Sequence, residues 1–185
     1  MKFLNTIKQK LGKRKIEKFL LNQRRRPNVS NFENARSIGL VYSISTSDYQ
    51  DIVERYVNFL KGEIGFKKIM VLGYYEGTKL PSFIVNQSLR YQYFTNKMVD
   101  FYCQGNCKEV TNFIKEDFDI LIDLSKDFEV PIKHAVAHSK SKFKVGRLSH
   151  ENKKYYDFMV EMPPNTSVTK FITQVNLFLT QVKPK

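Results

Sequence analysis

The chain predicts an α/β protein with one open, mostly parallel sheet and helices on both of its faces. Short apolar runs of strand length alternate with segments whose apolar residues recur at helical spacing. The run at 118–124 is almost continuously apolar, which is typical of a central parallel strand covered on both sides. A length of 185 residues suits one such domain plus an appendage. These observations together indicate a Rossmann-like sheet.

The first elements form a βαβ unit. A strand is expected at 38–44, and a helix starts near Ser47, with Gln50 three positions later as in a capping box. This helix ends at Gly62, and a second buried strand follows at 68–74. Two apolar strands joined by one helix are expected to pair in parallel.

The later elements are identified mainly from their boundaries. Pro131 fits the first turn of a helix, where its missing N–H is not needed. Pro163 and Pro164 separate the last strand from a final helix capped by Thr166 or Ser167. The other expected elements are strands at 91–94, 99–102, 118–124, 143–146 and 156–161, a helix starting near Cys107, and a helix from Pro131 through Ser139.

The N-terminal segment is expected to stand apart from this domain. Apolar residues on either side of Gly12 fall on opposite sides of a helical wheel, which predicts two short helices or one helix broken at Gly12. Pro27 disfavours the α region for the residue before it and so ends helical structure. We therefore expect a basic helical arm at 1–27, a linker at 28–35 and the α/β domain at 36–185.

Positive charge is concentrated in two places. The first 26 residues hold ten Lys or Arg and one acid, a net +9, and the stretch 130–156 adds +6. The whole chain carries +13, so the remainder is close to neutral at −2. Clustering of this kind indicates a polyanionic partner. The residues expected to bind it are Lys13, Arg14, Lys15, Arg24, Arg25, Arg26, Lys140, Lys142, Lys144, Arg147, Lys153 and Lys154.

The leading interpretation is a non-enzymatic, cytoplasmic protein that docks on RNA or on the ribosome. Lys140, Lys142 and Lys144 alternate and are expected to project from one side of a strand. Tyr155 and Tyr156 lie beside two lysines and offer stacking for single-stranded RNA. A cytoplasmic location is expected because the N-terminus lacks the long apolar run of a secretory signal and the chain has two cysteines.

The alternative partner is an anionic membrane surface. Phe3, Leu4, Ile7 and Leu11 form a small apolar stripe beside lysines, as in helices that lie in the plane of a bilayer interface. The dependence of binding on salt separates the two interpretations, because insertion of apolar side chains is less sensitive to salt than contacts to phosphates.

No sequence pattern specifies a reaction or a cofactor. Neither glycine-rich phosphate-binding motif occurs, and we expect no bound cofactor or metal. A zinc site made by Cys103, Cys107, His134 and His138 is the sharpest alternative, since each pair has a spacing of four. A third class, a small-molecule protein, would use Asp48 and Asp123 at the ligand-binding edge of the sheet.

Two resemblances support the fold. The segment at 116–124, followed by a helix and by Lys142-Phe143-Lys144-Val145-Gly146-Arg147, resembles an uncharacterised family of small basic bacterial α/β proteins from about residue 32 onward. The same succession at 116–148 is similar to the N-terminal half of heptosyltransferase-type glycosyltransferases. That likeness implies at most a degenerate small-molecule-binding domain. The chain ends where the donor-binding half would begin, so no donor site is expected.

Overall fold

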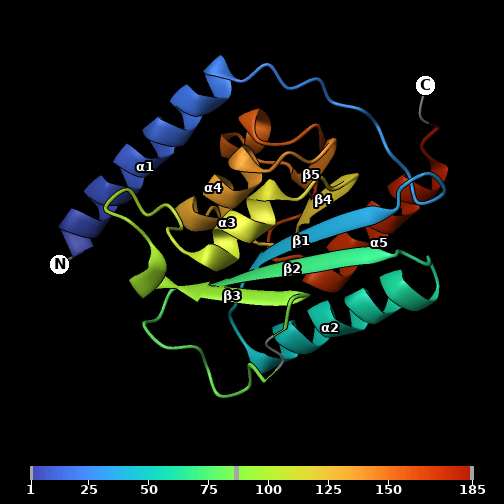
Figure 1. Cartoon of the computed structure of the whole chain (residues 1–185), viewed down its shortest axis with the longest axis horizontal. Helices are drawn as coiled ribbons and strands as arrows, with labels where there is room; N and C mark the ends of the chain where they lie inside the picture. Colours follow the sequence, from blue (N-terminus) through green and yellow to red (C-terminus); the bar gives the residue numbers. More distant parts are fainter. Residues whose placement is uncertain (1, 86–87, 184–185) are drawn as a thin grey trace.

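Six parallel strands form one sheet within residues 2–85 and 88–183, which the computed structural model describes (Figure 1). Their order, β3-β2-β1-β4-β5-β6, is that of a Rossmann sheet, and it confirms the predicted fold class. The order reverses between β1 and β4, which both pair with their neighbours in parallel. The strands are β1 (Ser37–Ser43), β2 (Lys68–Tyr75), β3 (Tyr91–Thr95), β4 (Ile120–Asp123), β5 (Phe143–Arg147) and β6 (Phe158–Val160).

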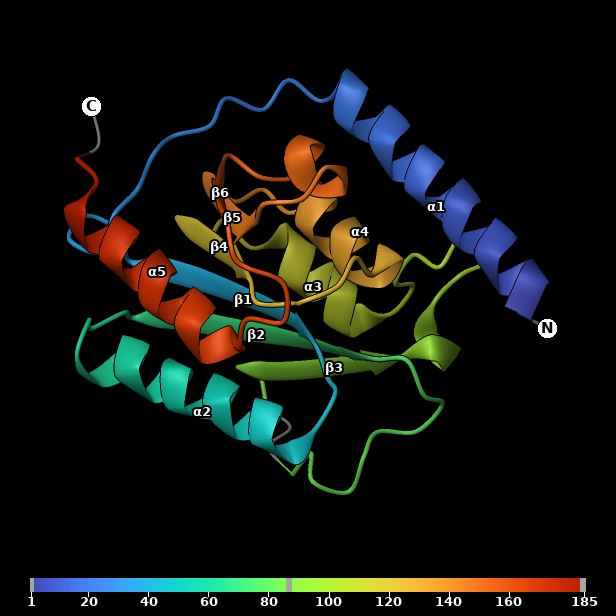
Figure 2. The ribbon, with the colours of Figure 1, turned by 180° about the vertical axis from the view of Figure 1, so that it is seen from behind.

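Helices cover both faces of this sheet. The pair α2 and α5 lies on one face, seen most clearly from behind in Figure 2, and the pair α3 and α4 lies on the other. Helix α1 packs against the outside of α4. The helices are α1 (Lys2–Asn22), α2 (Ser47–Gly62), α3 (Lys108–Lys115), α4 (Val130–His138) and α5 (Val168–Gln181), with single 3₁₀ turns η1 (Asn96–Met98) and η2 (Glu151–Lys154).

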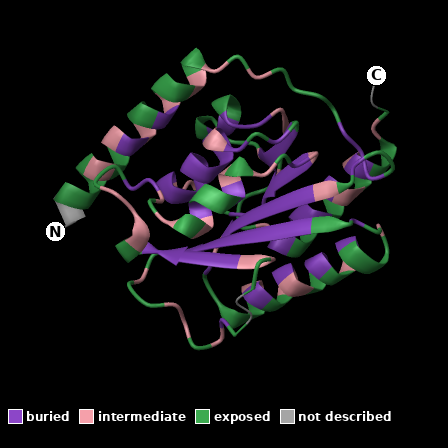
Figure 3. Ribbon diagram, viewed as in Figure 1, coloured by how far each residue is buried: buried purple, intermediate pink, exposed green. Residues whose placement is uncertain are grey.

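The apolar core has two layers, one on each side of the sheet (Figure 3). Successive side chains of a strand point to opposite faces, so Leu40 and Tyr42 pack under α2 and α5, whereas Val41 packs under α3 and α4. All three side chains are completely buried. Burial on both faces explains why the strands read as continuous apolar runs.

Two local predictions were wrong for reasons of turn chemistry. The expected strand at 99–102 does not form, because the Asp100 carboxylate accepts hydrogen bonds from the Tyr102 and Gln104 N–H groups and folds the segment into a turn. Only Val99 makes an isolated bridge, to Gly105.

The capping box expected at Ser47 is also replaced. The N-cap of α2 is Thr46, whose Oγ1 accepts a hydrogen bond from the Tyr49 N–H at 3.2 Å. The Gln50 side chain instead turns into the core, where it bonds to the hydroxyls of Tyr42 and Tyr93. Of the two caps proposed for the last helix, Ser167 is the one used.

Helix α1 is continuous through Gly12, so the predicted break was wrong. Gly12 is buried against the backbone of Tyr102, and a Cβ atom at residue 12 would lie 2.0 Å from the Tyr102 carbonyl oxygen. The glycine therefore allows close packing and does not interrupt the helix. Ile16, one turn later, is completely buried in the same interface.

Candidate functional site

The two basic segments of the sequence meet in the structure because α1 packs beside η2. Lys13 pairs with Glu151 of η2, and Glu17 pairs with Lys154 at 3.4 Å. A charge from each segment is thus neutralised by an acid of the other. Residues separated by more than a hundred positions become neighbours on one surface.

Of the three consecutive arginines at 24–26, the middle one contacts the domain and the other two are exposed. Arg25 pairs with Asp157, and its Nη1 donates to the carbonyl oxygens of Ser141 at 3.0 Å and Lys142 at 2.9 Å. Arg24 and Arg26 on either side remain exposed. Arg25 therefore holds the end of the arm to the domain, which makes it an internal contact and not a free binding residue.

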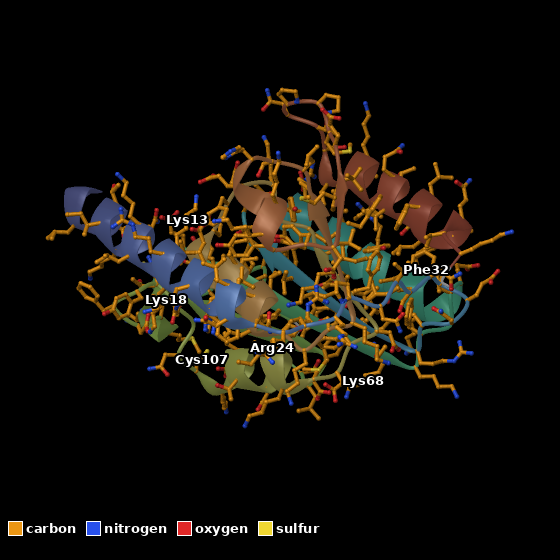
Figure 4. All side chains as sticks on the ribbon, turned by 90° about the horizontal axis from the view of Figure 1, so that it is seen from above. Lys13, Lys18, Arg24, Phe32, Lys68 and Cys107 are labelled. Atoms are coloured by element: carbon orange, nitrogen blue, oxygen red, sulfur yellow. The ribbon has the colours of Figure 1, made fainter. Side chains whose placement is uncertain are left out.

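Seven exposed cations of the two basic segments have neither an ion pair nor a contact with an aromatic ring within the part of the chain that the structure describes. Figure 4 shows Lys18 on the helix and Arg24 beyond its end. Lys15 is exposed as well, with its Nζ 4.4 Å from the centroid of the Tyr102 ring. We call the seven the basic face; they are Lys10, Arg14, Lys18, Arg24, Arg26, Lys140 and Lys153.

The expectation that Lys144 projects from the surface with Lys140 and Lys142 was wrong. Lys144 is 1% exposed, and its Nζ donates to the carbonyl oxygens of Val136 and Ala137 near the end of α4. Burial, together with the nearby Arg25 charge, lowers the pKa of Lys144 to about 7. Lys142 is exposed, but it pairs with Asp119 at 2.7 Å.

The two tyrosines expected to stack on RNA bases are buried. Tyr155 is 2% exposed and Tyr156 is 7% exposed. The Tyr156 hydroxyl bonds to the carboxylate of Asp123, which also pairs with Lys133 at 2.8 Å. These three groups form a closed polar cluster, which we call the buried triad.

The buried triad occupies the carboxyl end of β4, where open α/β sheets place their ligands. Asp123 also accepts a hydrogen bond from the Ser125 N–H at 2.8 Å, so both of its oxygens are occupied. Asp48 is exposed in the first turn of α2 and lines neither cavity of this edge. The structure does not join the two predicted aspartates into one open site.

A cavity of about 640 Å³ lies beside the point where the strand order reverses. Three carboxylates line it, those of Glu76, Asp127 and Glu129. Burial and the charges of Glu76 and Asp127 raise the pKa of Glu129 to about 7. This concentration of negative charge opposes the binding of a nucleotide phosphate at the position that a Rossmann sheet normally offers.

The four residues considered for zinc remain in separate pairs. The rings of His134 and His138 lie one turn apart, with centroids 4.4 Å from each other, and Phe19 stacks on His138. Cys103 and Cys107 are free thiols. Among the residues that the structure describes, no group of three or more His, Cys, Asp or Glu is arranged to hold a metal ion.

His134 predicts a dependence of stability on pH. Burial and the neighbouring His138 lower its pKa from 6.5 to about 4. Between these values the unfolded chain binds a proton that the folded chain does not, so stability falls as the pH is lowered. We expect the free energy of unfolding to drop by about 2–3 kcal/mol more in the parent than in His134→Phe between about pH 7 and 4.

Urea unfolding at each pH measures this difference. The control is His150→Phe, which removes a histidine from an exposed position. If the free energy of unfolding fell equally with pH in the parent and in His134→Phe, His134 would not be the group responsible for the loss of stability.

The chain belongs to a family of unknown function, DUF6913, whose model matches residues 8–182. No curated protein and no solved structure shows a significant match. In the described part of the chain, no helix is both long enough and apolar enough to cross a membrane.

Proposed function

We propose that this protein is a non-enzymatic, cytoplasmic RNA-binding protein that docks on RNA, above all ribosomal RNA, through the basic face. The observation that supports the proposal most is the packing of α1 beside η2, which unites two basic segments far apart in the sequence. The acids that α1 meets there leave the seven cations of the basic face exposed and without an ion pair in the described residues. Such a surface attracts a polyanion.

The arrangement of these cations suits a phosphate backbone. Lys10, Arg14 and Lys18 repeat every four residues, so they follow one side of α1. Arg24 and Arg26 extend the charge past the end of the helix, and guanidinium groups bind phosphate oxygens in pairs. Contacts of this kind position RNA without reading its sequence.

Replacing the three helical cations tests the proposal. The variant Lys10→Gln, Arg14→Gln, Lys18→Gln is expected to bind labelled single-stranded RNA more weakly. The slope of log affinity against log salt should shrink by about 2, since each lost phosphate contact removes about 0.7. Fluorescence anisotropy between roughly 50 and 200 mM salt measures both quantities.

The matched control removes the same residue types from the opposite face of the sheet. Arg55→Gln, Lys61→Gln, Lys170→Gln changes exposed positions of α2 and α5 and lowers the net charge equally. If both triple variants lose affinity to the same extent, binding depends on overall charge and the basic face is not the site.

A membrane surface is the second candidate, favoured by apolar side chains exposed on α1. Leu4 is 63% exposed, Leu21 is 79% exposed and Ile7 is 37% exposed. Apolar residues mixed with lysines are typical of interfacial helices. Binding to anionic vesicles that resists salt, together with no binding to RNA, would replace the first proposal by this one.

A further inference from the structure

Arg147 is partly buried and so is not one of the exposed cations of the basic face, although it belongs to the same basic stretch of sequence. It ends β5 and lines a cavity of about 370 Å³ formed by the loops that follow β4, β5 and β6. The cavity therefore opens at the carboxyl edge of the sheet, where proteins of this architecture bind small molecules. Its volume is within the range of ligand sites.

The Arg147 guanidinium has unused hydrogen-bonding capacity. Its Nε and Nη2 atoms are buried and have no acceptor in the described structure. Arg147 takes part in none of the ion pairs there, and its guanidinium stacks 4.4 Å from the centroid of the Phe171 ring. Buried N–H groups are normally hydrogen-bonded, because a buried donor without an acceptor is costly.

Further polar groups surround the same cavity. Lys126 lines it and donates to Asn165 Oδ1 at 3.3 Å. Asn152, only 8% exposed, donates through Nδ2 to the Arg147 carbonyl oxygen at 2.8 Å, while its Oδ1 atom has no partner in the described residues. Two acids also line the cavity: Glu151 is paired with Lys13, and Asp127 forms no ion pair with Arg147.

We propose that this cavity binds a small molecule through an oxyanion, a carboxylate or a phosphate monoester, with Arg147 as its anchor. The Nε and Nη2 atoms form the edge of the guanidinium that holds two oxygens of such a group at once. Lys126 supplies a second positive charge, and Asn152 Oδ1 accepts a hydrogen bond from a hydroxyl of the same ligand. The cavity is too small for a folded polynucleotide, so its ligand differs from the RNA proposed for the basic face.

Nuclear magnetic resonance of the arginine Nε–H groups tests the site in the full chain. Inorganic phosphate and acetate are titrated separately into the millimolar range at constant ionic strength, with chloride as the reference anion. We expect the Arg147 Nε–H signal to shift and saturate with at least one oxyanion but not with chloride. The two probes distinguish a phosphate ligand from a carboxylate ligand.

Substitutions identify the anchor. Arg147→Met should weaken oxyanion binding by roughly tenfold to a hundredfold, and Arg147→Lys should recover only part of it, because lysine lacks the planar fork. For these variants the titration is followed through backbone amides of the β6–α5 loop. Arg55→Met is the control, since Arg55 is exposed on α2.

Two outcomes would overturn the proposal: no saturable shift in the parent protein, or equal binding by the parent and Arg147→Met. The triple variant of α1 should bind the oxyanion normally. Loss of RNA binding in that variant and loss of oxyanion binding in Arg147→Met are thus separate results, so either proposal can fail alone.

Discussion

Lys133→Met is expected to lower the free energy of unfolding by about 3–5 kcal/mol, the usual result of removing one partner of a buried ion pair. The Lys133 Nζ lies 2.8 Å from Asp123 Oδ2, and the two side chains are 2% and 1% exposed. Without the lysine, the Asp123 carboxylate stays buried with only neutral partners. Urea unfolding followed by circular dichroism at neutral pH measures the loss.

A double-variant cycle shows whether the pair itself is responsible. Lys133→Met combined with Asp123→Asn removes both charges, so the double variant should be more stable than the sum of the single losses implies. Lys115→Met on α3 is the control, because this lysine is exposed and its loss should change stability by no more than about 0.5 kcal/mol. Strictly additive losses would show that the two charges do not depend on each other.

Gly12→Ala is expected to displace α1 from the domain. The added Cβ atom would lie 2.0 Å from the Tyr102 carbonyl oxygen, and a backbone atom cannot give way as a flexible side chain can. The cost should reach about 3 kcal/mol, the upper end for an overpacked site. Urea unfolding gives this cost, and faster trypsin cleavage between residues 8 and 26 reports release of the helix.

Gly62→Ala is the matched control for this experiment. Nothing lies within 4 Å of a Cβ atom at residue 62, so the same substitution should be harmless there. If Gly12→Ala and Gly62→Ala unfold alike and resist trypsin alike, the close approach of α1 to Tyr102 does not hold in solution. RNA binding by Gly12→Ala should also weaken, because the cations of α1 would no longer be held beside η2.

The sheet and most helices were predictable because their patterns are local. A buried parallel strand reads as an apolar run wherever its neighbours lie, and Pro131 indicates a helix start without knowledge of the rest. The role of Gly12 was not predictable in this way. A glycine is needed at residue 12 because the carbonyl group of Tyr102, ninety residues further along the chain, packs against it.

The candidate site was harder to predict, because a count of charges does not show which of them face inward. In the sequence, Arg25 and Lys144 look like their exposed neighbours Arg24 and Lys140. In the structure, however, Arg25 pairs with Asp157, and Lys144 donates to a backbone carbonyl of α4. One signal for the buried triad was present. Lys133 is the only cation in an otherwise apolar turn of α4, which is typical of a buried charge with a partner elsewhere.

The contacts of α1 also determine when, during synthesis of the chain, this helix can dock on the domain. The helix is made well before Glu151 and Lys154, which hold it, because these two residues lie more than a hundred positions further along the chain. A nascent chain must therefore carry an uncovered cationic helix until Glu151 and Lys154 have emerged. Docking of the helix closes a long loop and belongs to the final stage of folding.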